Sequence, residues 1–259
     1  MAFIDINTII IFLMATCRTS GCIFFNPIFG RTSVPAVVKV GLSMALGLYI
    51  VVLMQGRGTY MEDYTTLAFA LSMAKEFAIG FTLGYVMRVF LAIFTVSGYV
   101  IDMQAGYSMA TLYDASSNAQ VSITGNLTTI MFTLLFFVTN SHANLAALVV
   151  KTYDVIPLGM VGINREVGLY AIQMFGLMLI YAFQLTIPFI VLEVFTEVAV
   201  GMMMKMVPNI NVFVVNIHLK MLVGLILLLT IIPALGVFMT KLNTIMFERM
   251  TESLTYLIL

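Results

Sequence analysis

The sequence predicts an all-α protein of the integral-membrane type, and two features carry that prediction. Of the 259 residues, 61% are hydrophobic and only 9% are charged, whereas a soluble domain carries about 25% charged residues. The apolar residues also form long runs, separated by short stretches rich in Gly, Pro and polar residues. Too few polar side chains remain to cover a water-facing surface. We therefore expect the chain to lie in a membrane or against apolar partner subunits.

The first two apolar segments are separated by a clear turn. The first runs from Ile6 to Phe25. We expect it to be the first helix of the mature protein and not a cleaved signal, because Asp5 stands where a signal peptide carries positive charge. Pro27 and Gly30 then end this helix, and the second apolar segment runs from Val37 to Met54.

The third segment, from Leu67 to Ile101, is long enough for one very long helix or for a broken one. Gly80 and Gly84 are spaced four residues apart within it, which lets a second helix approach closely.

A polar stretch from Ser97 to Asn126 interrupts the apolar pattern at the middle of the chain. Asp114 to Gln120 has the composition of a turn, since Asp, Ser and Asn side chains bond to their own backbone. In apolar surroundings, irregular backbone is tolerated only where it is buried in protein or lines a wet cavity. Our hypothesis is that this stretch is a plug or gate on a pathway.

The second half continues with apolar runs from Leu127 to Val138 and from Val167 to Val200, joined by a connector that ends at Arg165. Pro188 lies inside the later run, so we expect a kink there.

Residues Gly201 to Asn211 are expected to break the pattern before another apolar run, Val212 to Met239. An amphipathic tail, Lys241 to Leu259, closes the chain. Together the runs predict about six membrane-spanning segments. The basic residues do not decide their orientation.

Several ionisable residues lie within or at the edges of the apolar runs, where charge is costly and usually functional. Two interpretations are open: buried ion pairs that fix how helices or subunits dock, which we favour, or a proton or substrate relay. Glu193 and Glu197 share one helical face and repel each other, so they need a cation from Lys220, Lys205 or a neighbouring subunit. The candidate anchors are Arg88, Asp102, Glu193, Glu197 and Lys220.

Four methionines follow Gly201 and cover much of one helical turn: Met202, Met203, Met204 and Met206. Ordinary packing against lipid or protein is the simplest interpretation. A deformable seal around a pore is the alternative, because Met side chains are flexible and adapt to varied shapes.

The sequence gives no support for an enzyme, a metal site or a nucleic-acid partner. His142 and His218 lie in different segments, with no further ligand at metal-binding spacing, and no catalytic motif is recognisable. We expect no cofactor. The 12 basic and 12 acidic residues balance, which argues against nucleic acid. Cys17 and Cys22 are expected to be buried free thiols, although a disulfide remains open.

Five local patterns occur in the order seen in one family, and together they cover nearly the whole chain. They are NPIFGRTSVPAVVKVGLS, KEFAIGFTLGY, IDMQAGYSMATLYDASS, FFVTNSH and VPNINVFVVNIHLKMLVG. The chain thereby resembles the FliR/SctT family, the R-type components of the bacterial flagellar and type III secretion export gate. The last pattern favours a flagellar system over an injectisome.

The resemblance implies a non-enzymatic subunit with broken and kinked apolar helices. It implies a P-like helical portion, residues 1–165, fused to a Q-like helical hairpin with an amphipathic tail, residues 166–259. Members of the family assemble in the usual ratio of five P and four Q subunits to one R subunit. The complex lies in the bacterial inner membrane, within the flagellar basal body, in contact with lipid and further export-apparatus components.

In this family the loop matching Gly106 to Ser122 plugs the channel that unfolded protein substrates pass through. The resemblance therefore implies plug residues Gly106, Tyr107, Ser108, Met109, Ala110, Leu112, Tyr113, Asp114, Ser116 and Ser117. The alternative function is a small-molecule secondary transporter of the inner membrane. It would explain the apolar segments, prolines and buried charges, but we find no internal repeat.

Overall fold

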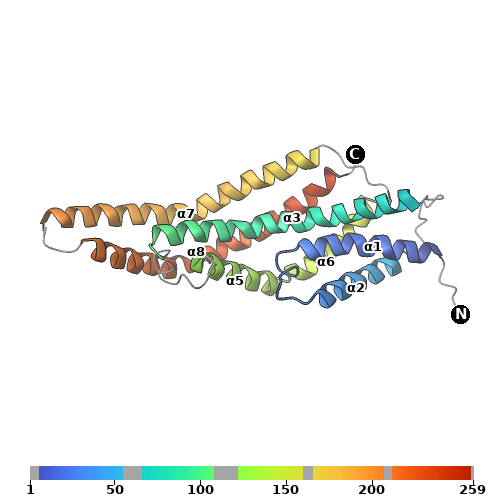
Figure 1. Cartoon of the computed structure of the whole chain (residues 1–259), viewed down its shortest axis with the longest axis horizontal. Helices are drawn as coiled ribbons and strands as arrows, with labels where there is room; N and C mark the ends of the chain where they lie inside the picture. Colours follow the sequence, from blue (N-terminus) through green and yellow to red (C-terminus); the bar gives the residue numbers. More distant parts are fainter. Residues whose placement is uncertain (1–5, 55–65, 108–121, 160–165, 207–211, 258–259) are drawn as a thin grey trace. The chain divides into compact units, whose positions relative to one another are not determined.

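Every regular element of the described chain is a helix, as the composition predicts. The computed structural model describes residues 6–54, 66–107, 122–159, 166–206 and 212–257 (Figure 1). Its helices are α1 (Ile6–Phe25), α2 (Ala36–Met54), α3 (Thr66–Gln104), α5 (Ile123–Val138), α6 (Ser141–Val155), α7 (Glu166–Met206) and α8 (Val212–Thr255).

Most of these helices are long and apolar enough to cross a membrane. Within the described ranges there are 5 such helices, or up to 6 if α5 and α6 form one broken span. The bend between α5 and α6 is 70°. Asn140 lies at the break with a φ of 54°, in the left-handed region that Asn tolerates better than most residues. The prediction of about six spanning segments is confirmed.

Some helix limits differ from the sequence prediction. The third segment is one continuous helix, α3, and not a broken one. The break predicted from Gly201 is wrong, because α7 continues to Met206 through methionines that are good helix formers. The final run and the amphipathic tail form the single helix α8, which passes through Pro233. Helix α7 likewise continues through Pro188, and the kink predicted there stays a prediction.

The chain forms two compact units, and each draws on both sides of Arg165. Unit 1 comprises Met1–Phe90, Phe136–Phe175 and Asn243–Leu259, and unit 2 comprises Leu91–Leu135 and Gly176–Leu242. These units are defined by packing and do not test where a P-like and a Q-like portion divide. The division near residue 165 therefore stays a prediction.

Helices α1 and α3 meet in unit 1 at three glycines, which explains their close approach. A Cβ atom added at Gly80 would overlap the carbonyl oxygen of Arg18, and one added at Gly21 would overlap that of Phe77. Gly84 faces Phe25 in the same way, with an added Cβ lying 2.9 Å from the Phe25 Cβ. The close approach predicted from the glycine spacing is confirmed.

Unit 2 has a comparable crossing between α3 and α5. A Cβ atom at Gly98 would overlap the backbone of Gly125. Beside this crossing the rings of Phe94 and Phe132 pack with their centroids 4.9 Å apart. Ile101 continues the core against α7 and α8.

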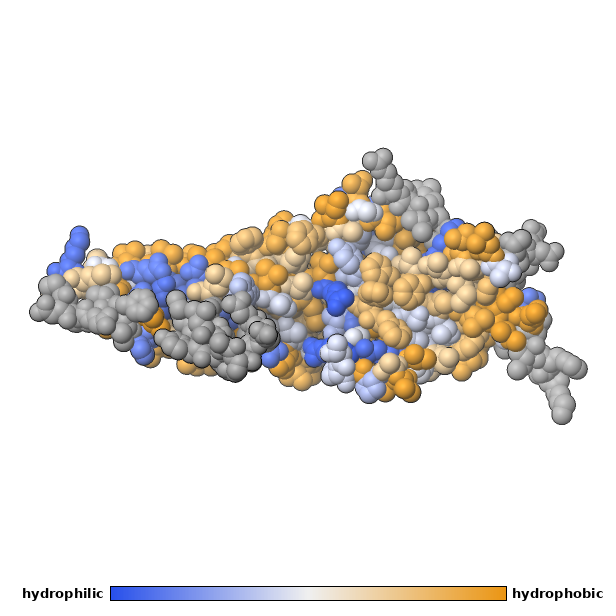
Figure 2. Space-filling view, viewed as in Figure 1, coloured by the Kyte–Doolittle hydropathy of each residue, from blue (hydrophilic) through white to orange (hydrophobic). Residues whose placement is uncertain are grey.

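Much of the apolar surface remains uncovered within the single chain, and Figure 2 shows hydrophobic residues spread over the visible face. Only 28% of the most apolar window of α7 and 17% of that of α8 is buried. Exposed apolar side chains in such numbers suit lipid or other subunits better than water.

Candidate functional site

The ionisable residues predicted to be functional are gathered mainly in unit 2, where three stretches of chain contribute to one cluster. We define the unit 2 cluster as Asp102, Tyr107, Glu193, Glu197 and Lys220. It combines the end of α3 and the following turn with facing parts of α7 and α8.

Asp102 is buried at the end of α3 and binds the start of α5. Its carboxylate accepts hydrogen bonds from the Ser122 hydroxyl at 2.7 Å and from the Thr124 amide at 3.2 Å. The Gly125 amide donates to the Ser122 oxygen at 2.8 Å. A negative charge at a helix N-terminus is favourable, because the first amides of a helix have no partner within it. Asp102 therefore acts as a cap supplied by another helix.

Tyr107 follows the end of α3, directly after Gly106. The φ of Gly106 is 76°, which lies in the region that favours glycine. The tyrosine hydroxyl donates to the carbonyl oxygen of Met221 on α8 at 3.2 Å. Burial raises the pKa of Tyr107, and the carboxyl groups of Asp102 and Glu193 raise this pKa further. The hydroxyl thus remains a protonated donor, and it ties the end of α3 to α8.

The two glutamates on α7 have different environments. Glu197 is exposed and forms an ion pair with Lys220 of α8. Lys220 was one of the three partners that the sequence allowed for these glutamates, together with Lys205 and a neighbouring subunit. Glu193 is only 1% exposed, and neither of its carboxyl oxygens has a hydrogen-bond partner among the described residues.

The remaining predicted residues lie apart from the unit 2 cluster or outside the described chain. Arg88 belongs to unit 1 and is exposed, because it points away from the core that its neighbours Met87 and Val89 enter. Its role as an anchor stays a prediction. The plug residues from Ser108 to Ser117 lie outside the described residues.

The four methionines predicted as a seal are all exposed, from 45% at Met204 to 82% at Met206. They do not pack into the core of this chain, so contact with lipid, with another subunit or with a channel remains a prediction.

The sequence reasoning missed the most completely buried ion pair, Arg18 with Glu76 in unit 1. Both side chains are 0% exposed, and the Arg18 Nε donates to the Glu76 Oε2 at 2.6 Å. The guanidinium also donates to the Thr152 hydroxyl and the Ile156 carbonyl and lies 4.1 Å from the Tyr153 ring centroid. One basic and one acidic residue, each inside an apolar helix, could have suggested the pair.

This network satisfies the polar groups that it buries, which indicates a structural role. The second oxygen of Glu76 accepts the Gly159 amide at 3.0 Å. The network thus joins α1, α3 and α6 with the turn that follows α6. No acidic or basic group within it is left for chemistry.

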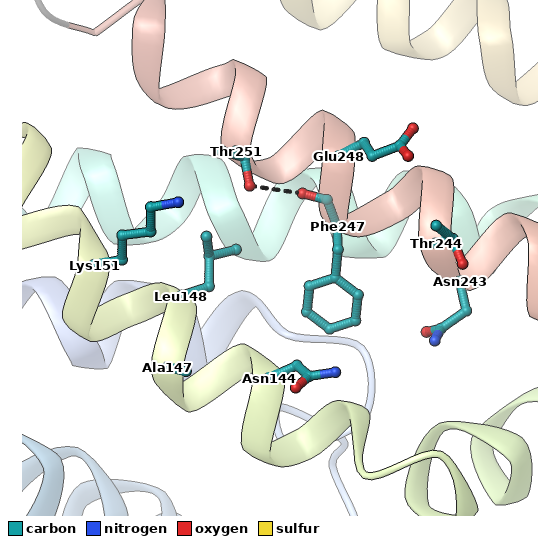
Figure 3. A pocket seen from close by; sticks show the side chains of 9 residues that line it. All are labelled: Asn144, Ala147, Leu148, Lys151, Asn243, Thr244, Phe247, Glu248 and Thr251. Carbon is teal, nitrogen blue, oxygen red and sulfur yellow. Dashed lines mark hydrogen bonds between the residues drawn. The ribbon is translucent and has the colours of Figure 1, made fainter.

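Unit 1 also contains an open groove of about 490 Å³ between α6 and the C-terminal part of α8 (Figure 3). Lys151 and Glu248 line its edges, and the Phe247 ring lies between the two helices. The Asn243 amide donates to Ser141 at 2.8 Å. The lining residues include no nucleophile with an adjacent base, so the groove gives no indication of catalysis.

Across the ranges that the structure describes, no group of three or more His, Cys, Asp or Glu residues could hold a metal ion. Cys17 and Cys22 are both free thiols, so the disulfide alternative is wrong. Cys22 is buried and Cys17 is partly buried.

Comparison with known proteins decides the family. The family described as "Bacterial export proteins, family 1" matches residues 9–246. The chain belongs to this family. It is 26% identical over 240 residues to flagellar biosynthetic protein FliR of Escherichia coli, covering 93% of this chain and 91% of the relative. It is 27% identical over 248 residues to the FliR protein of Bacillus subtilis, covering 94% of each chain.

A third relative aligns over a smaller share of its length. Yop proteins translocation protein T of Yersinia pestis is 23% identical over 214 residues, covering 82% of this chain and 81% of the relative. As a member of the bacterial export family, the chain is a membrane component of the flagellar/type III export apparatus and not an enzyme. The resemblance that five local patterns indicated is confirmed.

Proposed function

We propose that the chain is the R-type subunit of a flagellar protein-export gate, a closed channel that opens for unfolded export substrates. The family match over residues 9–246 is the observation that carries this proposal. A flagellar system is favoured over an injectisome, because the FliR proteins of Escherichia coli and Bacillus subtilis align with 93% and 94% of the chain and the Yop relative with 82%.

The partners in this proposal are P-type and Q-type subunits, in the ratio of five P and four Q to one R. The uncovered apolar faces of α7 and α8 support burial against such subunits, since little of either helix is covered within the chain. In this proposal residues 1–165 take the place of a P-type subunit, and residues 166–259 take that of a Q-type hairpin.

The proposed plug is the loop from Gly106 to Ser122. Tyr107 is bonded to α8, while Ser122 is bonded to Asp102 at the end of α3. Both ends of the proposed plug are therefore attached to helices, which supports a loop that returns to a fixed position after a substrate has passed.

Native mass spectrometry tests the assembly. The chain would be co-expressed with its genomic neighbours, purified in detergent and released intact into the spectrometer. We expect one copy of this chain in a complex with several copies of two small apolar partners. A monomer or homodimer without partners would contradict the gate and favour a small-molecule transporter.

A further inference from the structure

Glu193 is a buried carboxyl group that has no ion-pair partner of its own among the described residues. Its side chain is 1% exposed, and neither oxygen has a hydrogen-bond partner among the residues that the structure describes. Glu197 lies one turn along α7 and takes the nearby cation, Lys220. The two carboxyl groups therefore share one lysine, and the exposed group holds it.

Within the part of the chain that the structure describes, the surroundings of Glu193 offer no second cation. Its Oε1 would lie 3.4 Å from a Cβ atom at Gly224, which stands one turn after Lys220 on α8. The Tyr107 hydroxyl lies over the same glycine but donates to the Met221 carbonyl instead.

The other titratable groups near this position are engaged or lie on another face. The Asp102 carboxylate is bonded to the start of α5, and Tyr107 interacts electrostatically with both Asp102 and Glu193. His218 lines a groove together with Tyr107 and Leu225, and Glu193 is not among the residues that line it. Among the described residues, the charges that act on Glu193 are those of Lys220 and Glu197.

A carboxylate that is buried without a cation or hydrogen-bond donors is strongly disfavoured, and such a group keeps its proton instead. We propose that Glu193 is a proton-binding site, and that loss of its proton transfers Lys220 from Glu197 to Glu193. In this step the carboxyl O–H bond breaks, the proton passes to water, and the new carboxylate attracts the ammonium group.

The spacing of the residues suits this exchange. Glu193 and Glu197 are four residues apart on α7, which separates them by about 6 Å along the axis at 1.5 Å per residue. Lys220 and Gly224 have the same separation on α8 and face the glutamates in reverse order. A lysine side chain is flexible enough to move between neighbouring turns. The site does not depend on the gate function, because it consists of residues of this chain alone.

Infrared spectroscopy tests the bound proton directly. The full chain would be purified in detergent at neutral pH, and the carbonyl band of protonated carboxyl groups would be recorded. We expect Glu193→Gln to remove one carboxyl's share of this band, while the control variant Glu248→Gln, which changes an exposed carboxylate away from the cluster, retains it. An unchanged band in Glu193→Gln would overturn the proton site.

Stability gives a second readout. Glutamine imitates the protonated acid, so we expect Glu193→Gln to melt within a few degrees of the wild type at neutral pH. As pH rises, the wild type must ionise a buried group and should lose stability that the variant keeps. A variant that melts far below the wild type at neutral pH would show instead that the ionised carboxylate stabilises the fold, and would overturn the proposal.

The exchange of Lys220 has its own test. Without this lysine, deprotonation of Glu193 gains no cation, so Lys220→Gln should move the loss of the infrared band to higher pH. A band that titrates at the same pH in Lys220→Gln would overturn the exchange.

Discussion

Arg18 and Glu76 show how a charged pair is accommodated in an apolar interior. Separately, each would be an isolated buried charge, which is among the least favourable features a fold can contain. Together they are surrounded by a hydroxyl, a carbonyl, an amide and an aromatic ring. Removing one member should therefore be more damaging than removing both.

We predict that Glu76→Ala destabilises the chain by about 3–5 kcal/mol, because Arg18 then remains buried without its carboxylate. The double variant Arg18→Met/Glu76→Leu should be closer to the wild type, since apolar groups of similar size replace the pair. Melting temperatures of the purified chain in detergent would measure both. Glu248→Ala is the control, because this carboxylate is exposed.

If the double variant were less stable than Glu76→Ala, the ion pair would contribute more to stability than the apolar groups that replace it, and the prediction would be wrong.

The candidate site was only partly predictable from the residues. Asp102, Glu193 and Lys220 stand out because each is charged in an apolar run. Which of them pair could not be predicted, since a partner is set by how the helices face one another. Arg18 was overlooked for the same reason, because its carboxylate lies 58 residues away in the sequence.

At the scale of single helices, the glycine crossings decide how closely α1 and α3 can pack. A Cβ atom at Gly80 would overlap the Arg18 carbonyl and lie 2.8 Å from the Cys22 amide nitrogen. Backbone atoms cannot move aside as a side chain can. The two helices would have to separate.

We therefore predict that Gly80→Ala destabilises the chain by at least about 1–3 kcal/mol, the usual effect of overpacking. Gly41→Ala is the matched control, since no atom lies within 4 Å of a Cβ added there. It should be neutral or stabilising by up to about 1 kcal/mol, because alanine favours helix more than glycine does. Equal melting temperatures for the two variants would contradict the crossing.

Helix α5 depends on Asp102 for its first turn. We predict that Asp102→Ala weakens this cap by about 0.5–2 kcal/mol, the usual loss when a capping oxygen is removed. Hydrogen exchange followed by mass spectrometry should then show faster exchange in the peptide that contains Thr124 and Gly125. Asp102→Asn should have a smaller effect, because its amide oxygen can still accept. Unchanged exchange in Asp102→Ala would rule out the cap.

Helix positions were predictable where hydrophobic runs are long, and helix ends were less so. The first helix ends shortly before Pro27, and the second begins after Pro35 and ends shortly before Gly56. The helix break expected from Gly201 was wrong, because the composition changes there while the residues still favour a helix. Methionine and lysine continue a helix as readily as leucine does.

At the scale of the whole molecule, the fold class followed from the scarcity of charge. A chain with 9% charged residues must find an apolar environment, and helices satisfy their own backbone there. The packing into two units with interleaved segments did not follow. It depends on contacts between helices that are distant in sequence.

The plug can be tested without disturbing the helices that flank it. We predict that replacing residues 108–121 with a Gly/Ser linker of equal length raises ion leak through the assembled complex in liposomes. Tyr107 and Ser122 should be kept, because they attach the ends of this stretch to α8 and α3. Unchanged leak in a complex of normal mass would contradict the plug.

The hydrogen bond between Asp102 and Ser122 has a consequence for engineering. It joins the end of α3 to the start of α5, so these two helix ends are held together by their own contact. Doubling the length of a flexible loop costs only about 0.6 kcal/mol in closure entropy. A spectroscopic reporter or affinity epitope inserted between Tyr107 and Ser122 should therefore leave α3 and α5 folded. This position would allow a probe to be placed at the proposed channel itself.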